Sequence, residues 1–158
     1  MNEYMKVAKE LSEESIKKNY GGPFGACVVK DGKIIGRGSN HVLIYNDPTA
    51  HAEIVAIRDA CKNINSYDLK GCTLFTTCYP CPMCLSAIIW ANIGKVYYGN
   101  SKEDAASIGF RDDFIYNYIK ELIDGNEDAS VLSLNCIDRE ETIKLFEEYS
   151  NKNDKIIY

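Results

Sequence analysis

The sequence lacks the features that mark membrane and secreted proteins. It contains no uninterrupted run of about 18 apolar residues, so we expect no membrane-spanning helix. Residues 1–15 alternate charged with apolar side chains and have no apolar segment of the kind found in signal peptides. We therefore expect a protein of the cytoplasm with no membrane contact.

Dense clusters of Lys or Arg are also missing, and the formal net charge is −5. Nucleic-acid binding draws much of its affinity from Lys and Arg side chains that neutralise phosphates. An acidic chain can still carry a local basic patch, but no such run is visible in this sequence. The charge pattern disfavours a nucleic-acid partner and favours a small molecule.

Cysteine, in contrast, is plentiful. The chain has seven cysteines, an odd number, and no sign of export. In that setting cysteines are typical of free thiols or metal ligands rather than of a disulfide framework. The seven are Cys27, Cys61, Cys72, Cys78, Cys81, Cys84 and Cys136.

The chain shows no repeats, linker or low-complexity segment, and 158 residues fit a single domain, which we expect over residues 1–158. Apolar spacing and turn signals predict helices and strands in alternation after a hairpin at Asp31-Gly32. That order indicates an α/β fold with helices on both faces of a mixed sheet. The predicted helices are 3–18, 50–62, one beginning at Pro82, a short one within 101–123, and 140–149; the predicted strands are 26–29, 33–36, 72–77, 95–98 and 131–137.

Two short motifs carry the chemistry: His51-Ala52-Glu53 and Pro80-Cys81-Pro82-Met83-Cys84. Cys81 and Cys84 are three residues apart, so on a helix they share a face. The start of a helix favours thiolates through its dipole and free N–H groups. With His51 as the third ligand, the set leaves a fourth position for water, as in catalytic zinc sites. We expect one Zn²⁺ per subunit.

Glu53 lies two residues beyond His51 and can face the same pocket without binding the metal. Zinc can lower the pKa of a water toward roughly 7, but a base must still accept a proton and an acid must protonate the ring and the departing amine. Glu53 is the predicted catalytic residue for both steps. The pattern H-x-E with P-C-x-x-C is typical of zinc-dependent nucleobase deaminases.

Other interpretations of these motifs remain open. Cys78 precedes Cys81 by three residues, so His51 and three cysteines could form a closed structural zinc site. That interpretation gives Glu53 no role. Cys81 and Cys84 could also form a redox pair, although the second proline and His51 argue against it.

The motifs together resemble those of the cytidine-deaminase superfamily and, within it, the bacterial guanine deaminases. The resemblance extends over most of residues 4–120 and weakens afterwards. It rests on Gly21-Gly22-Pro23-Phe24-Gly25-Ala26, Asn46-Asp47-Pro48-Thr49-Ala50-His51-Ala52-Glu53, Pro80-Cys81-Pro82-Met83-Cys84 and Gly109-Phe110-Arg111-Asp112-Asp113-Phe114-Ile115-Tyr116.

The resemblance implies a three-layer α/β/α sandwich around a five-stranded mixed sheet. It also implies a homodimer in which the C-terminal segment, about residues 138–158, swaps between subunits. The implied reaction is the hydrolysis of guanine to xanthine and ammonia. The residues that it assigns to the site, besides the metal ligands and Glu53, are Asp112 as a second catalytic carboxylate, Phe24 for stacking, Asn40 and Ala52 for ring contacts, Trp90 as a pocket wall and Tyr158 as a lid.

Tyr79 departs from the resemblance, because guanine and tRNA-adenosine deaminases usually carry Glu there. A bulky phenol beside the pocket could change which ring fits. Cytosine, a guanosine-type nucleoside and an aminotriazine are therefore alternative substrates. Deamination of tRNA adenosine is a further alternative that the acidic charge disfavours.

Overall fold

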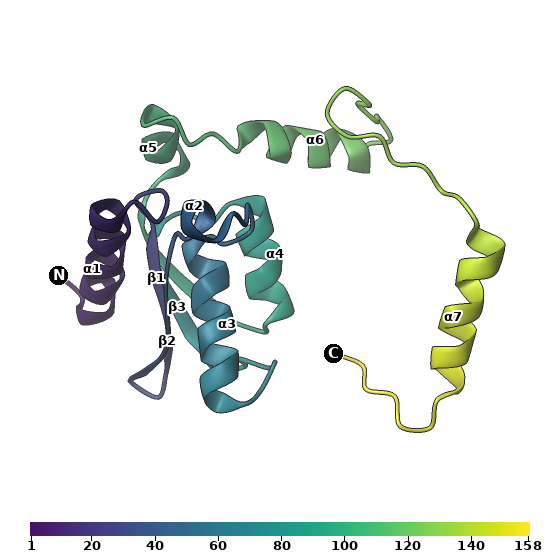
Figure 1. Ribbon diagram of the computed structural model, residues 1–158, viewed down its shortest axis with the longest axis horizontal. Coiled ribbons are helices and arrows are strands. Elements are labelled where there is room, and N and C mark those ends of the chain that lie inside the picture. Colours follow the sequence, from purple (N-terminus) through teal and green to yellow (C-terminus); the bar gives the residue numbers. More distant parts are fainter. The chain divides into compact units, whose positions relative to one another are not determined.

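The computed structural model describes residues 1–158 and divides the chain into two compact units, Met1–Tyr116 and Asn117–Tyr158. The first unit contains the sheet and both chemical motifs (Figure 1). The expected single domain over 1–158 stays a prediction, and the separable C-terminal unit begins at Asn117, before the expected residue 138.

The sheet of the first unit has four strands in the order β2-β1-β3-β4. β1 pairs antiparallel with β2 and β3, whereas β3 pairs parallel with β4, so the sheet is mixed. The strands are β1 (Gly25–Lys30), β2 (Lys33–Ser39), β3 (Thr73–Cys78) and β4 (Lys95–Asn100). The α/β class is as predicted, but the sheet has four strands where five were expected.

The fifth predicted strand, residues 131–137, is not a strand in this chain. Its apolar spacing is real, but a strand needs a neighbouring backbone with which to pair its N–H and C=O groups. Val131, Leu132 and Leu134 are each about half exposed, at 49%, 51% and 53%. The segment has strand composition without a partner in this chain.

The β1–β2 hairpin closes at the predicted turn. Asp31 and Gly32 both have positive φ, 49° and 75°, the backbone required by a two-residue type I′ turn. Lys30 pairs with Lys33 directly across that turn. Asp-Gly meets this requirement because glycine adopts positive φ freely and aspartate tolerates it.

Helices cover both faces of the sheet (Figure 1). Side chains alternate across β1: Ala26 and Val28 face the core shared with α3 (Ala52–Ile64) and α4 (Pro82–Trp90), whereas Cys27 and Val29 face α1 (Glu3–Lys18). Asn2 caps α1 by accepting hydrogen bonds from the N–H groups of Tyr4 and Met5. The two small cores hold the sheet between these helices.

Glycines in β2 let α3 lie directly on the sheet. A Cβ at Gly38 would lie 2.2 Å from the carbonyl oxygen of Ala52, and one at Gly36 would lie 2.4 Å from that of Ala56. A larger residue at either position would push the helix away. This close packing sets the height of α3, whose first turn carries Glu53.

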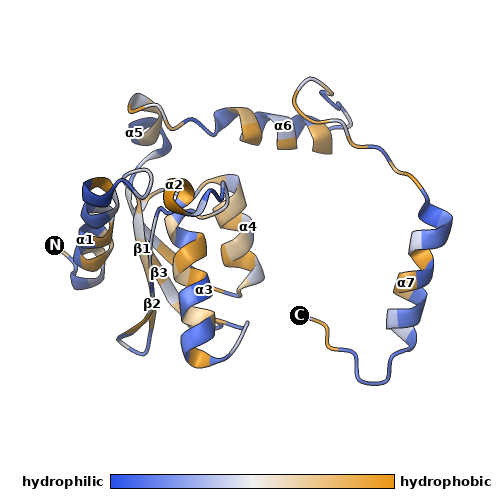
Figure 2. Cartoon of the chain, in the orientation of Figure 1, coloured by the Kyte–Doolittle hydropathy of each residue, from blue (hydrophilic) through white to orange (hydrophobic).

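The remaining helices are α2 (Val42–Tyr45), α5 (Lys102–Ser107), α6 (Asp113–Ile123) and α7 (Arg139–Asn151). The unit Asn117–Tyr158 contains the end of α6 and all of α7, and none of its residues is buried. Figure 2 shows apolar residues along α6 and in α7. No helix of the chain is both long and apolar enough to cross a membrane.

Candidate active site

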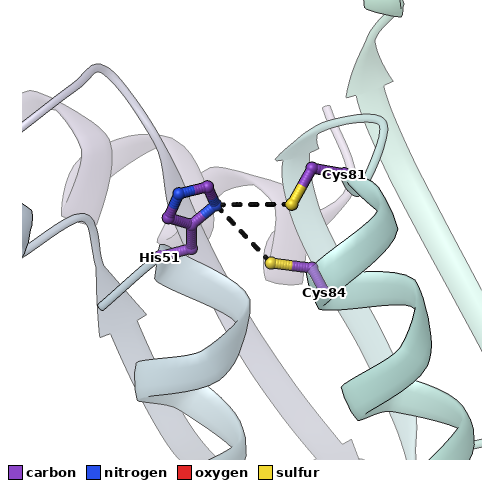
Figure 3. Close-up of side chains that lie close together, drawn as sticks. All are labelled: His51, Cys81 and Cys84. Carbon is purple, nitrogen blue, oxygen red and sulfur yellow. Dashed lines mark hydrogen bonds between the residues drawn. The ribbon is translucent and has the colours of Figure 1, made fainter. Parts of the chain in front are cut away.

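The two chemical motifs lie at the starts of neighbouring helices. His51 is the N-cap of α3 and Cys81 is the N-cap of α4, each with extended backbone. Pro82 takes the first helical position, where its missing N–H costs no hydrogen bond. Cys84 follows one turn later and shares a face with Cys81. The two helix starts therefore bring the imidazole opposite both sulfurs (Figure 3).

The donor atoms form a tight cluster. Nδ1 of His51 lies 3.6 Å from Sγ of Cys81 and 3.7 Å from Sγ of Cys84. Tetrahedral zinc with bonds of about 2.0–2.1 Å to nitrogen and about 2.3 Å to sulfur separates these atoms by about 3.6 Å. One imidazole nitrogen and two sulfurs are also ligands that zinc prefers. The cluster fits one zinc ion.

Proton sharing within the cluster favours negative charge on one sulfur. Hydrogen bonds from Cys84 and His51 hold the pKa of the Cys81 thiol well below its usual range, while the neighbouring Cys81 sulfur raises the pKa of Cys84. The hydrogen bond to Cys81 raises the pKa of His51, and burial opposes that effect. Cys81, at the start of α4, is therefore favoured as a thiolate, the form that binds a metal cation.

Glu53 lies beside the cluster without belonging to it. Its side chain is only 5% exposed. Thr76 Oγ1 donates a hydrogen bond to Glu53 Oε1 (2.8 Å), and Cys84 Sγ donates to Oε2 (3.4 Å). Burial raises the pKa of this carboxyl, which brings it nearer the range where a group can both take and give a proton.

Cys78 is not part of the donor cluster. Its thiol donates instead to the carbonyl oxygen of Ser101 (3.5 Å), and burial raises its pKa to about 11. The closed site of His51 with three cysteines is therefore not formed. The metal-binding group has three residues, which leaves one tetrahedral position without a protein ligand.

A cavity of about 340 Å³ opens beside the cluster. His51, Cys81 and Glu53 all line it, so the metal-binding group and the carboxyl face the same cavity. Phe24 and Phe110 also line the cavity, in edge-to-face contact with 4.9 Å between their ring centres. The cavity is within the range of small-molecule sites.

Comparison with known proteins identifies this arrangement. Residues 1–100 match the family model described as the cytidine and deoxycytidylate deaminase zinc-binding region. The chain is 53% identical over 116 residues to guanine deaminase of Bacillus subtilis, covering 73% of this chain and 74% of that protein. The chain belongs to the cytidine and deoxycytidylate deaminase family.

Two further matches place this deaminase among its relatives. An X-ray structure of guanine deaminase from Bacillus subtilis is similar over 100% of this chain and 99% of its own, with a TM-score of 0.90 and 42% identity. A tRNA-specific adenosine deaminase of Buchnera aphidicola is 40% identical over 136 residues, 82% of this chain and 89% of that protein. Membership of the deaminase family and the His51, Cys81 and Cys84 group together support the predicted zinc ion, one per chain.

The other predicted site residues occupy varied places in this deaminase. Phe24 and Asp112 line the cavity, and burial raises the pKa of Asp112. Asn40 is buried, and its Oδ1 accepts a hydrogen bond from the N–H of Val42 (3.2 Å). Ala52 is fully buried in the core next to His51.

Trp90 and Tyr158 do not share this burial. Trp90 ends α4 with 70% of its surface exposed and does not line the cavity. Tyr158 is 80% exposed and belongs to the unit Asn117–Tyr158. Their assigned roles as pocket wall and lid stay predictions.

Three residues around the deaminase site were missed in the sequence. Thr76 holds Glu53, while Lys102 and Tyr116 meet beside the cavity. Thr76 left a weak signal, a polar residue near the end of the apolar run that leads to Cys81. Tyr116 ends the motif of residues 109–116 but was given no role, and Lys102 left no signal, because their contact depends on how α5 and α6 follow β4.

Proposed function

We propose that this chain hydrolyses guanine to xanthine and ammonia. The observation that carries the proposal is the buried Glu53 carboxyl beside a three-residue zinc-binding group, both facing one cavity. Similarity to the guanine deaminase of Bacillus subtilis supports guanine as the ring.

Bound zinc supplies the Lewis acidity that makes a water molecule nucleophilic near neutral pH. Glu53 would move both protons of the attacking water in turn: it passes the first to the ring nitrogen and the second, taken from the hydroxyl group of the ring adduct, to the departing amine. The Thr76 hydroxyl holds Oε1 of Glu53, so the carboxyl keeps one orientation during both transfers. Water is consumed and ammonia released, and no other reactant is needed.

The remaining side chains bind and orient the ring in this proposal. Phe24 stacks on its face, and Asp112 accepts a hydrogen bond from the amine as it leaves. Because the Val42 N–H occupies Oδ1 of Asn40, the amide NH₂ of Asn40 is the group left to donate to a ring carbonyl. The backbone beside Ala52 adds a further ring contact.

The test is a side-by-side assay of zinc-loaded protein with guanine, cytosine, guanosine and an aminotriazine. We expect equal amounts of xanthine and ammonia from guanine. If ammonia is released only from another ring, guanine is not the substrate. Tyr79, which lines the cavity, would then be the residue expected to select that ring. No ammonia from any ring would overturn the deaminase activity itself.

Deamination of adenosine in tRNA is the second candidate, favoured by the similarity to the tRNA-specific adenosine deaminase of Buchnera aphidicola. The net charge of −5 opposes it, because tRNA binding requires neutralised phosphates. A gel-shift assay at low salt separates the two: a tRNA complex that dissociates as salt rises would favour this candidate over guanine.

We also propose a homodimer in which the C-terminal unit of one chain packs on another. Three features support it: no residue of 117–158 is buried, residues 131–137 have strand composition without a partner, and β4 is an edge strand whose outer side is unpaired. Addition of 131–137 to a sheet edge would give the five-stranded, three-layer sandwich. The segment of about 138–158, with Tyr158, would then reach a neighbouring site.

The cytoplasm is the proposed location of the protein. None of the seven cysteines is in a disulfide bond. Free thiols on this scale fit a reducing compartment.

A further inference from the structure

A lysine stands between two tyrosine rings in the wall of the cavity. The Lys102 ammonium lies 5.3 Å from the centre of the Tyr79 ring and 4.9 Å from that of Tyr116. Lys102 forms no ion pair, and the two tyrosine rings are the groups that its ammonium contacts. Tyr79 and Lys102 both line the cavity.

Tyr116 connects this contact to the metal-binding loop. Its hydroxyl donates to the carbonyl oxygen of Pro80 (3.2 Å), the residue before Cys81. Its backbone N–H donates to the carbonyl oxygen of Asp112 (3.3 Å), which closes the first turn of α6. Tyr116 therefore holds the start of α6 against the loop that carries the metal ligand.

Asp112 depends on this anchor because its carboxyl makes no hydrogen bond to any other residue of the chain. The carboxyl lines the cavity at the start of α6, and its position follows from where the first turn of the helix lies. Lys102 also attracts the Asp112 carboxylate, while the adjacent Arg111 is paired with Asp113 (3.0 Å). Lys102 is thus the cation that acts on Asp112 both through Tyr116 and directly.

We propose that Lys102 is a positioning residue for the reaction: it clamps Tyr79 and Tyr116 and so fixes Asp112 in the cavity. The inference rests on the role that the proposed function gives to Asp112. It assigns to Lys102 an effect on turnover without contact with the ring. A similar lysine–tyrosine contact away from the cavity should have no such effect.

The chain offers a matched control in Lys95, whose ammonium lies 5.9 Å from the Tyr97 ring on β4 and does not line the cavity. We would measure kcat and KM for guanine, bound zinc and the thermal midpoint for K102M, K102R and K95M. We expect K102M to lower kcat about tenfold, as the loss of two cation–π contacts allows, with KM changed less than about twofold. The kcat of K102R should stay within about threefold of the wild-type value, and the kcat of K95M should equal the wild-type value. All three variants should bind one zinc ion per chain.

The proposal is overturned if K102M keeps the wild-type kcat, or if K102R loses as much as K102M. The proposal is also overturned if the loss of activity in K102M is no larger than its loss of bound zinc or of folded protein. Lys102 would then have only a structural role.

Combining the change with D112N tests whether Lys102 acts through Asp112. We expect K102M to cost less than about twofold in the D112N background, because coupled residues are not additive. A full tenfold loss on top of D112N would show that Lys102 acts independently and would contradict the proposal. If D112N alone keeps the wild-type turnover, Asp112 has no catalytic role and the proposed role of Lys102 is rejected with it. The proposed deamination of guanine by the wild-type protein would not be affected by that result.

Discussion

Thr76 is the residue that holds Glu53, the proposed proton carrier, in place. It lies fully buried on β3, and its hydroxyl donates to Glu53 Oε1 at 2.8 Å. T76V keeps the shape but leaves a buried carboxyl oxygen without its partner, so we expect a loss of about 1–3 kcal/mol in unfolding free energy and about tenfold in kcat. Urea denaturation and ammonia release measure the two effects.

Thr73 provides the control on the same strand, because its half-buried side chain has no hydrogen bond to the protein. T73V should change kcat less than about twofold. Equal activities for T76V and T73V would mean that Glu53 needs no support from Thr76.

Residues were predictable from the sequence where chemistry depends on close spacing. Cys81 and Cys84 lie within one helical turn, and Glu53 follows His51 by two residues, so each motif could be recognised locally; the pairing of the two motifs was predicted from their joint occurrence. Contacts across the fold were not predictable in this way. Thr76 lies 23 positions from Glu53, and Tyr116 lies 36 positions from Pro80, so only tertiary packing reveals these pairs.

At the scale of elements, the glycines of β2 set the position of α3. A Cβ at Gly38 would lie 2.2 Å from Ala52 O and 2.4 Å from Ala56 N, and backbone atoms of a packed helix cannot move aside cheaply. We expect G38A to cost about 1–3 kcal/mol of stability and to lower kcat by displacing the first turn of α3. Urea denaturation with a parallel kinetic assay measures both.

Gly94 is the matched control, since a Cβ there meets nothing within 4 Å. G94A should change stability by less than about 0.5 kcal/mol. Indistinguishable unfolding curves for G38A and G94A would disprove the close contact between β2 and α3.

Elements with strong local signals were predicted well, and elements that need a partner were not. The hairpin follows from Asp31-Gly32, and the start of α4 follows from Pro82. Residues 131–137 were predicted as a strand from apolar and β-branched composition alone. The composition of a segment indicates that it can pack against a core as a strand. To pair its backbone, the strand also needs a free sheet edge, and the sequence does not say on which chain that edge lies.

At the scale of the whole molecule, large apolar side chains are exposed in the C-terminal unit. Side chains such as Phe146 (74% exposed) and Ile137 (75%) in the C-terminal unit have no core of their own. We expect sedimentation equilibrium to give about twice the chain mass of 17.8 kDa. L132D/L134D places two charges on one face of the 131–137 segment and should yield monomers with reduced turnover.

K17E changes the net charge by the same two units at an exposed position of α1, in the first unit, and should leave the dimer intact. A wild-type protein that sediments at the single-chain mass at micromolar concentration would contradict the proposed dimer. Dimers of unchanged stability in L132D/L134D would exclude residues 131–137 from the interface.

The most direct measurement is the turnover of E53Q together with its zinc content. Glutamine keeps an oxygen that can accept the Thr76 hydrogen bond but cannot carry the proton. We predict one zinc per chain, an unchanged thermal midpoint and a loss of at least about 100-fold in ammonia release from guanine. Near wild-type turnover by zinc-loaded E53Q would contradict Glu53 as the proton carrier and, with it, the proposed active site.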